Sequence, residues 1–127
     1  MVTYDAITES IAVSVRPVYL DGQSDLLARR FVFAYFISIE NHGVCDVQLL
    51  RRHWIIKDDD GGVQEVEGEG VVGEQPVIPP GGEHNYNSFC VLPTFTGTME
   101  GTYLMQRETG ERFRIQIPRF DLRAQTN

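Results

Sequence analysis

Residues 31–39 read FVFAYFISI, and this stretch decides the fold. Five large apolar residues occupy alternate positions, which a β-strand would place on one face: Phe31, Phe33, Tyr35, Ile37 and Ile39. The first half is apolar on both faces, which is typical of a strand in the middle of a sheet. A helix that spans a bilayer needs about 20 apolar residues, roughly twice this length. We therefore predict a central β-strand and no membrane span.

The segments before this stretch predict one strand and one loop. Ile11, Val13 and Val15 alternate with small or polar residues, and Pro17 is expected to end that strand. Residues 18–29 have no hydrophobic period and contain turn formers, so they predict a long polar loop. Such loops often carry function.

Residues 47–57 predict the next strand, because aromatic and β-branched residues return there. Trp54, the only tryptophan, is expected to anchor the core. The turn formers of residues 59–62 (DDGG) predict a hairpin to a partner strand at about residues 63–67. Simple alternation divides the apolar side chains of the strand at residues 47–57 between two faces: Leu50, Trp54 and Ile56 on one, and Val47, Leu49 and Ile55 on the other.

The last third of the chain predicts three more strands and a short edge strand. Residues 83–92 form one strand, and residues 97–107 and 111–118 form a hairpin that Pro118 ends. Residues 120–123 could add the edge strand. The segment before residue 83 is not expected to pair regularly, because prolines and glycines crowd it: Pro76, Pro79, Pro80, Gly81 and Gly82.

These signals add up to about seven strands separated by turns, with no helical period. They predict an all-β fold, an antiparallel β-sandwich of the immunoglobulin or fibronectin type III kind. A small closed barrel is the alternative. The length of 127 residues predicts a single domain, residues 1–127, with short frayed ends at about 1–6 and 124–127.

The net charge and the N-terminal sequence indicate the kind of partner and the compartment that we expect. The net charge of −7 disfavours nucleic acid as a partner, because binding it requires Lys and Arg to neutralise phosphates. The first ten residues lack the basic start and the apolar run of an export signal, so we expect a cytoplasmic protein. In that compartment Cys45 and Cys90 are expected to stay reduced.

Residues 68–73 (GEGVVG) have the glycine spacing of a phosphate-binding loop: Gly68, Gly70 and Gly73. In a dinucleotide-binding fold this loop opens a helix whose N-terminus holds the pyrophosphate. Here Pro76 follows too soon for a long helix, and residues 58–106 contain no Lys or Arg. We therefore favour a turn or a partner-binding loop, and nucleotide or pyrophosphate binding or hydrolysis stays the alternative.

Metal and catalytic signals are weaker. Asp58, Asp59 and Asp60 offer oxygen ligands for a cation such as Mg²⁺, but they lack the alternating spacing of a calcium loop. A solvated hairpin tip is the favoured interpretation. The chain has no paired CxxC or HxxxH spacing and no Gly-x-Ser-x-Gly elbow. We predict no catalytic residue and no cofactor, with Mg or Co binding at these aspartates as a hypothesis.

Four stretches resemble the ApaG family: residues 19–24 (YLDGQS), 47–56 (VQLLRRHWII), 68–76 (GEGVVGEQP) and 97–103 (GTMEGTY). Two departures are Asp25, where the family more often has a proline, and the pair Phe89-Cys90. The resemblance covers nearly the whole chain. It implies a fibronectin type III-like sandwich in a small bacterial cytoplasmic protein. A related domain serves partner binding in some eukaryotic F-box proteins.

The resemblance also implies indirect functional links. The family is linked by phenotype to cobalt resistance and magnesium efflux, and by gene neighbourhood to diadenosine tetraphosphate hydrolysis. It carries over no catalytic residue. We therefore predict a non-catalytic ligand- or protein-binding module, a monomer or weak dimer, with an indirect link to divalent-cation homeostasis. Residues 65–82 and 19–25 would engage the unknown protein or small-molecule partner, through Gly68, Gly70, Gly73, Glu74, Gln75, Gln23 and Ser24.

Overall fold

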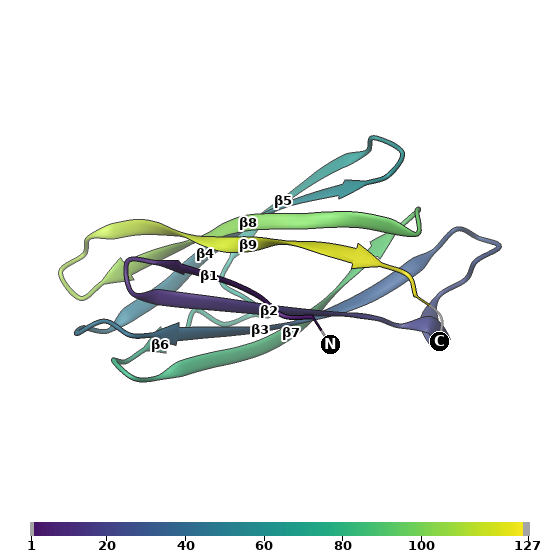
Figure 1. Cartoon of the computed structure of the whole chain (residues 1–127). Coiled ribbons are helices and arrows are strands. Elements are labelled where there is room, and N and C mark those ends of the chain that lie inside the picture. Colours follow the sequence, from purple (N-terminus) through teal and green to yellow (C-terminus); the bar gives the residue numbers. More distant parts are fainter. Residues whose placement is uncertain (1, 126–127) are drawn as a thin grey trace.

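The computed structural model describes residues 2–125, which form nine β-strands and one 3₁₀ turn (Figure 1). No α-helix occurs within these residues. The predicted all-β class is confirmed. The elements are β1 (Tyr4–Thr8), β2 (Ile11–Tyr19), η1 (Asp21–Gln23), β3 (Phe31–Asn41), β4 (Val47–Asp58), β5 (Val63–Glu69), β6 (Val77–Ile78), β7 (Glu83–Leu92), β8 (Thr96–Arg107) and β9 (Arg112–Arg123).

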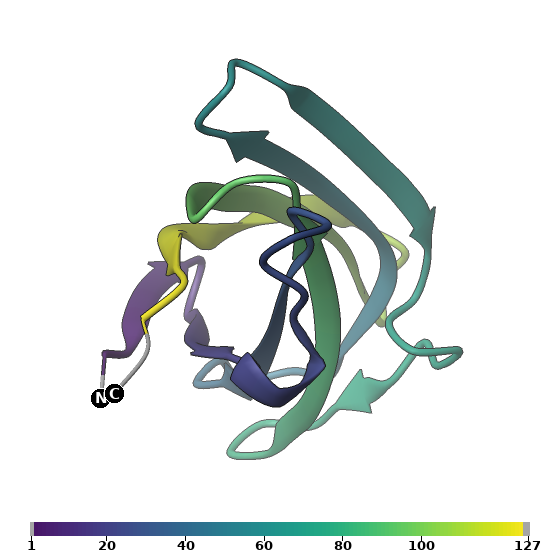
Figure 2. The same cartoon turned by 90° about the vertical axis from the view of Figure 1, so that its right-hand side faces the viewer.

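The strands form two antiparallel sheets packed face to face. One sheet, here called the first sheet, has the order β1-β2-β3-β7. The second sheet has the order β5-β4-β8-β9, with the short β6 also paired to β4. The end-on view shows the two layers and the β4–β5 hairpin standing away from the rest (Figure 2). The predicted antiparallel sandwich is confirmed, with more strands than the seven expected.

Strand β3 occupies the position that its sequence predicts. It lies between β2 and β7, and its first five residues are buried on both faces. Phe33 and Ile39 are completely inaccessible to solvent. Burial of each such side chain stabilises the fold by about 1.5–3 kcal/mol, so this strand contributes heavily to the core.

Aromatic rings join the two sheets at the centre of the core. Trp54 of β4 is 3% exposed, and its ring lies 5.3 Å from that of Tyr35 across the sandwich. It also contacts Tyr103 and Phe120 edge-on, with ring centroids 6.5 and 6.0 Å away. Edge-to-face packing at these distances is favourable beyond the area buried. The prediction that Trp54 anchors the core is confirmed.

A β-bulge in β4 overturns the predicted faces of that strand. Leu49 pairs with Met105 and Arg51 pairs with Leu104, so Leu50 is the extra residue. A bulge shifts the alternation by one residue, which moves the following side chains to the other face. Leu49 and Trp54 therefore both point into the core, whereas simple alternation had separated them.

The N-terminal region is more ordered than its sequence suggests. Strand β1 begins at Tyr4, inside the segment expected to fray. Strand β2 continues through Pro17 to Tyr19, so the prediction that Pro17 ends it is wrong. The pairing of β1 with β2 stops at Val15, so beyond that point β2 has a neighbour on one side only. A proline is tolerated there, because its missing N–H does not interrupt a ladder on the open side.

Two later segments also depart from the sequence predictions. Strand β9 runs without interruption through Pro118, where a break was expected, and its register against β8 shifts between Met99 and Gly101. Bulges are places where sheets accept proline. Val77 and Ile78 pair with β4, although the surrounding prolines had excluded pairing. Residues 126 and 127 of the expected frayed C-terminal end lie outside the described residues.

Candidate functional site

The glycine loop, residues 68–76, makes a tight turn between β5 and β6. The Val71 N–H donates to the Glu74 carbonyl over 2.8 Å, and the Glu74 N–H donates back to the Val71 carbonyl over 3.0 Å. The two residues at the tip have positive φ angles, 47° for Val72 and 78° for Gly73. This is the pattern of a type I′ turn, which strongly prefers Asn-Gly. A β-branched residue with positive φ is an outlier, so Val72 is strained.

The base of the loop is anchored to the bulge of β4. The Leu50 carbonyl accepts hydrogen bonds from the Gly70 N–H at 2.8 Å and from the Gln75 side-chain amide at 2.9 Å. Val71, at 1% exposure, inserts into the core. Gly70 cannot be replaced, because a Cβ there would lie 2.2 Å from the Glu74 carbonyl oxygen. The loop is therefore rigid, and the predicted residues Gly70, Gly73, Glu74 and Gln75 belong to one unit.

Arg52 of β4 clamps the loop from the inside of the sandwich. Its Nη1 donates to the Glu69 carbonyl at 3.0 Å and to the Gly70 carbonyl at 2.9 Å. Gly68 lies directly under the guanidinium group, and a Cβ there would come within 2.9 Å of Nη1. The fold thus brings a distant arginine to a loop that has no basic residue of its own.

This arrangement is the reverse of a phosphate cradle. A phosphate-binding loop points its backbone N–H groups at the anion. Here the N–H groups of Gly70, Val71 and Glu74 donate to carbonyls within the chain. The loop instead points two carbonyl oxygens at a cation, the Arg52 guanidinium.

A buried group of tyrosines lies near Arg52, between the sheets. The hydroxyls of Tyr86 and Tyr103 hydrogen-bond to each other. Burial raises the pKa of both phenols, and the charge of Arg52 offsets a small part of that rise. Burial also raises the pKa of Tyr35, against a lowering effect of its hydrogen bond with Ser88. All three phenols are therefore protonated at neutral pH.

Among residues 2–125, the cysteine and histidine side chains do not gather into one group that could hold a metal ion. Both Cys45 and Cys90 are free thiols, and burial raises the pKa of Cys90 to about 11, so it is not a thiolate at neutral pH. His84 Nε2 lies 3.7 Å from Glu74 Oε2, beyond hydrogen-bond distance. His53 Nε2 lies at similar distances from two glutamates of β5.

The other predicted segment, residues 19–25, lies elsewhere. The Ser24 hydroxyl donates to the Leu20 carbonyl at 2.8 Å and accepts from the Val32 N–H at 3.0 Å, so it closes its own loop. Gln23 is exposed in η1. This loop lies at the end of the molecule that carries the β4–β5 hairpin tip, where Arg29 lies 3.4 Å from Asp60, and away from the glycine loop (Figure 1). The structure therefore does not bring Gln23 and Ser24 to the glycine loop.

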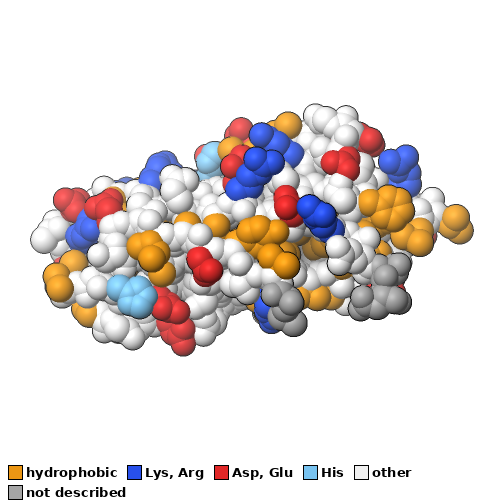
Figure 3. Space-filling model, viewed as in Figure 1, with side chains coloured by type: hydrophobic (Ala, Val, Ile, Leu, Met, Phe, Trp, Pro, Cys, Tyr) orange, Lys and Arg blue, Asp and Glu red, His pale blue; other side chains and the backbone are white. Residues whose placement is uncertain are grey.

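Exposed hydrophobic side chains accompany that distant loop. Leu27 is fully exposed and Leu26 is 54% exposed. The space-filling view shows hydrophobic side chains protruding at this end, while basic and acidic side chains are interspersed over the visible face (Figure 3).

The aspartates at the β4–β5 hairpin tip are engaged in hydrogen bonds and an ion pair. Asp58 Oδ1 accepts the N–H groups of Asp60 and Gly62 at 2.8 and 2.9 Å. Asp59 accepts the Thr96 hydroxyl, and Asp60 lies 3.4 Å from the Arg29 guanidinium. Within residues 2–125, no three His, Cys, Asp or Glu side chains lie close enough together to hold a metal ion.

The family of the chain follows from comparison with known proteins. A family model for the ApaG domain matches residues 21–107. This chain belongs to the ApaG family. Protein ApaG of Paramagnetospirillum magneticum is 53% identical over 119 residues, which cover 94% of this chain and 92% of that protein. Protein ApaG of Brucella suis is 48% identical over the same length and the same shares.

Solved structures agree with the fold of this ApaG domain. The crystal structure of the putative ApaA protein from Bordetella pertussis matches with a TM-score of 0.87 at 47% identity, over 89% of this chain and 92% of that one. The resemblance stated from the sequence is therefore confirmed. Among residues 2–125, no helix is long and apolar enough to cross a membrane.

Sequence reasoning missed two residues that shape the site. The contact of Arg52 with Gly68 joins residues of two strands, so it has no local signal in the sequence. The strain at Val72 arises because the loop forms a type I′ turn. Such turns prefer Asn-Gly, so the sequence Val-Gly does not predict one. A glycine opposite an arginine in a predicted hairpin is the one signal that could have suggested the clamp.

Proposed function

We propose that this ApaG-family chain is a non-catalytic binding module whose glycine loop contacts a partner protein through Val72. One observation carries the proposal: Val72 is 65% exposed and holds a φ of 47°. An L-residue in the left-handed region costs about 1–2 kcal/mol, and a β-branched residue is among the least suited to it. Strain of this kind clusters at functional sites, where the surrounding structure holds the residue in place.

The surroundings of Val72 support a role in recognition. The tip is held by the mutual hydrogen bonds of Val71 and Glu74, by the buried Val71 side chain and by Arg52. A loop fixed in one conformation loses little entropy when it binds. An exposed apolar side chain on a rigid support is a suitable anchor for a pocket on another protein.

The alternative function, nucleotide or pyrophosphate binding or hydrolysis through residues 68–73, has less support. Three N–H groups of the loop are already used, and Arg52 is occupied by two carbonyls. The exposed carboxylates of Glu69 and Glu74 flank the tip and would repel an anion. The glycines are explained by turn geometry and by the space that Arg52 needs.

We infer that any link to cobalt or magnesium homeostasis runs through the partner. This inference is supported by the contacts of Asp58, Asp59 and Asp60, the densest group of carboxylates. Their oxygens already accept hydrogen bonds from the hairpin backbone and from Thr96, or lie beside the Arg29 guanidinium. We place the module in the cytoplasm as a monomer or weak dimer, on the resemblance to its family. The interspersed charges in Figure 3 and the net charge of −7 favour a protein over a nucleic acid.

The test compares two valine variants in affinity capture from a bacterial lysate, quantified by mass spectrometry. Val72→Asn replaces the exposed apolar tip with a residue that suits the turn, so the fold is kept. Val44→Asn is the matched control, because Val44 is 96% exposed and has no positive φ. We expect Val72→Asn to lose partners that both wild type and Val44→Asn retain. Equal capture by all three proteins would contradict the proposal.

A second experiment addresses the alternative function. Amide shifts are followed during titration with pyrophosphate, ATP and diadenosine tetraphosphate, each with and without Mg²⁺. We expect no localised shifts at residues 68–76. Saturable shifts confined to that loop would favour the nucleotide hypothesis over ours.

A further inference from the structure

Strand β7 forms a free edge of the first sheet. It ends the order β1-β2-β3-β7, and its described pairing is with β3 alone. The register runs without a shift from the pair Phe31 and Leu92 to the pair Glu40 and Glu83. An edge strand of ten residues presents unpaired N–H and C=O groups, which can pair with another strand.

The other edges of the sandwich carry protection that β7 lacks. Strand β1 has only five residues, β5 carries a glutamate at every second position, and β9 contains a proline and a bulge. Short length, charges, proline and bulges are the usual means of blocking edge pairing. Residues 85–92 (NYNSFCVL) contain no charge, no proline and no bulge.

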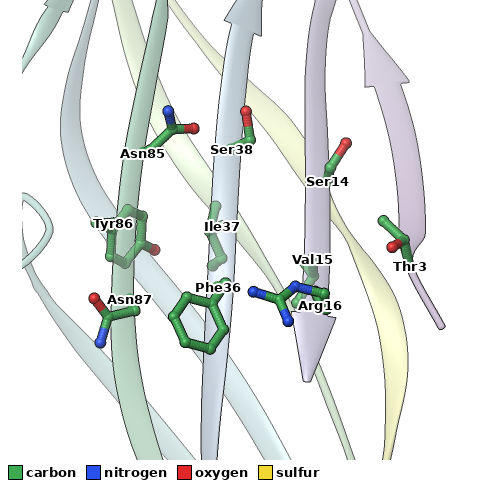
Figure 4. Close-up of a pocket in the computed structure, with 10 residues that line it drawn as sticks. All are labelled: Thr3, Ser14, Val15, Arg16, Phe36, Ile37, Ser38, Asn85, Tyr86 and Asn87. Carbon is green, nitrogen blue, oxygen red and sulfur yellow. The ribbon is translucent and has the colours of Figure 1, made fainter. Parts of the chain in front are cut away.

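The side chains beside this edge define what could lie along it. On the outer face of the first sheet, Phe89 and Val91 are 59% and 47% exposed. Further along, Asn85 and Asn87 border a shallow groove of about 380 Å³ with Phe36 of β3 (Figure 4). A strand added to β7 would place alternate side chains next to these residues. Apolar residues fit beside Phe89 and Val91, and polar uncharged residues fit beside Asn85 and Asn87.

The far end of the edge supplies a charge requirement. Glu83 lies directly opposite Glu40 in the register of β7 against β3. Glu40 is paired with His42, whose Nε2 lies 2.9 Å from its carboxylate. Glu83 accepts a 3.4 Å hydrogen bond from the Ser38 hydroxyl, and among residues 2–125 no cation is paired with it. Like charges directly opposite each other on a sheet are destabilising. A Lys or Arg on an added strand would give Glu83 a cationic partner.

A second copy of this chain fits poorly. Strand β7 contains no Lys or Arg, so self-pairing brings no cation to Glu83. Each copy also adds a net charge of −7. We propose instead that β7 accepts an extended segment of another protein as a fifth strand of the first sheet. That segment has apolar residues beside Phe89 and Val91 and a basic residue beside the Glu83–Glu40 pair.

The test uses synthetic nine-residue peptides and amide-shift titration of the full chain. The probe is acetyl-Val-Ser-Val-Ser-Thr-Ser-Thr-Ser-Lys-amide, ordered so that antiparallel addition places its lysine beside Glu83. We expect saturable shifts in β7 and β3, with binding weakened roughly threefold or more when the peptide lysine becomes glutamate. Glu83→Lys should reverse that preference.

Two variants test whether the peptide binds by pairing with the β7 edge. Phe89→Lys adds the charge that protects natural edges and should abolish binding while circular dichroism shows a folded protein. Val63→Lys, at a 61% exposed position on the β5 edge, is the matched control and should bind as wild type. Val72→Asn should also bind as wild type, because the two sites are independent.

Three results would overturn the proposal. The first is the absence of shifts at millimolar peptide. The second is equal binding of the lysine and glutamate peptides. The third is a concentration-dependent shift of β7 without peptide, which would assign the edge to a second copy of the chain.

Discussion

Replacing Val72 with asparagine should stabilise the protein, which is unusual for a change from an apolar to a polar residue. The left-handed backbone at Val72 costs about 1–2 kcal/mol, and asparagine tolerates that conformation far better. About a third of the side chain is buried, so its loss costs roughly 0.6 kcal/mol of the 1.5–2 kcal/mol that a whole valine contributes. The balance is a gain of about 1 kcal/mol.

Urea and thermal unfolding measure this gain. A gain of that size should raise the melting temperature by about 3–5 °C in a chain of this length. Val44→Asn, the control without a positive φ, should stay within about 0.5 kcal/mol of wild type. A loss of stability in Val72→Asn would refute the reasoning, because it would mean that packing of the valine outweighs its strain.

Three further predictions concern the interior behind the loop. Arg52→Met should destabilise the fold by about 2 kcal/mol in urea unfolding, because the Glu69 and Gly70 carbonyls lose their charged donor. An unchanged urea midpoint would mean that Arg52 does not hold the loop. Tyr103→Phe should lower the free energy of unfolding by about 1–2 kcal/mol, because it leaves the Tyr86 hydroxyl without its partner. The double variant with Tyr86→Phe should recover part of that loss, and strictly additive effects of the two changes would show that the hydroxyls do not interact. Burial raises the pKa of Cys90 to about 11, so the unfolded chain loses that proton first as pH rises and the folded state loses stability. Between pH 9 and 11 the free energy of unfolding of wild type should fall by about 2 kcal/mol more than that of Cys90→Ala, and parallel curves would exclude this effect.

Regular alternation made most of the fold predictable from sequence. The long strands β3, β8 and β9 each hold an uninterrupted apolar face over much of their length, and period 2 is a strong signal at that length. Strand β1 was missed, because Tyr4, Ala6 and Thr8 alternate with Asp5 and the exposed Ile7, which leaves no clear apolar face.

The candidate site was less predictable, because its geometry depends on two features that have no local signature. The bulge at Leu50 frees the carbonyl that anchors the loop, and nothing in the run of residues 49–51 marks it. The contact of Arg52 with Gly68 depends on the register of β4 against β5. The glycine spacing was recognised from the sequence. Whether the loop can bind an anion depends on where its N–H and carbonyl groups point, which the spacing does not show.

The central claim is that the backbone N–H groups of Gly70, Val71 and Glu74 are used within the chain, whereas those of Val72 and Gly73 at the tip are free. Residue-resolved amide hydrogen exchange, measured with and without pyrophosphate, tests this claim most directly. We predict slow exchange at Gly70, Val71 and Glu74, fast exchange at Val72 and Gly73, and no change when pyrophosphate is added. Fast exchange at all five amides that slows on addition of pyrophosphate would contradict it.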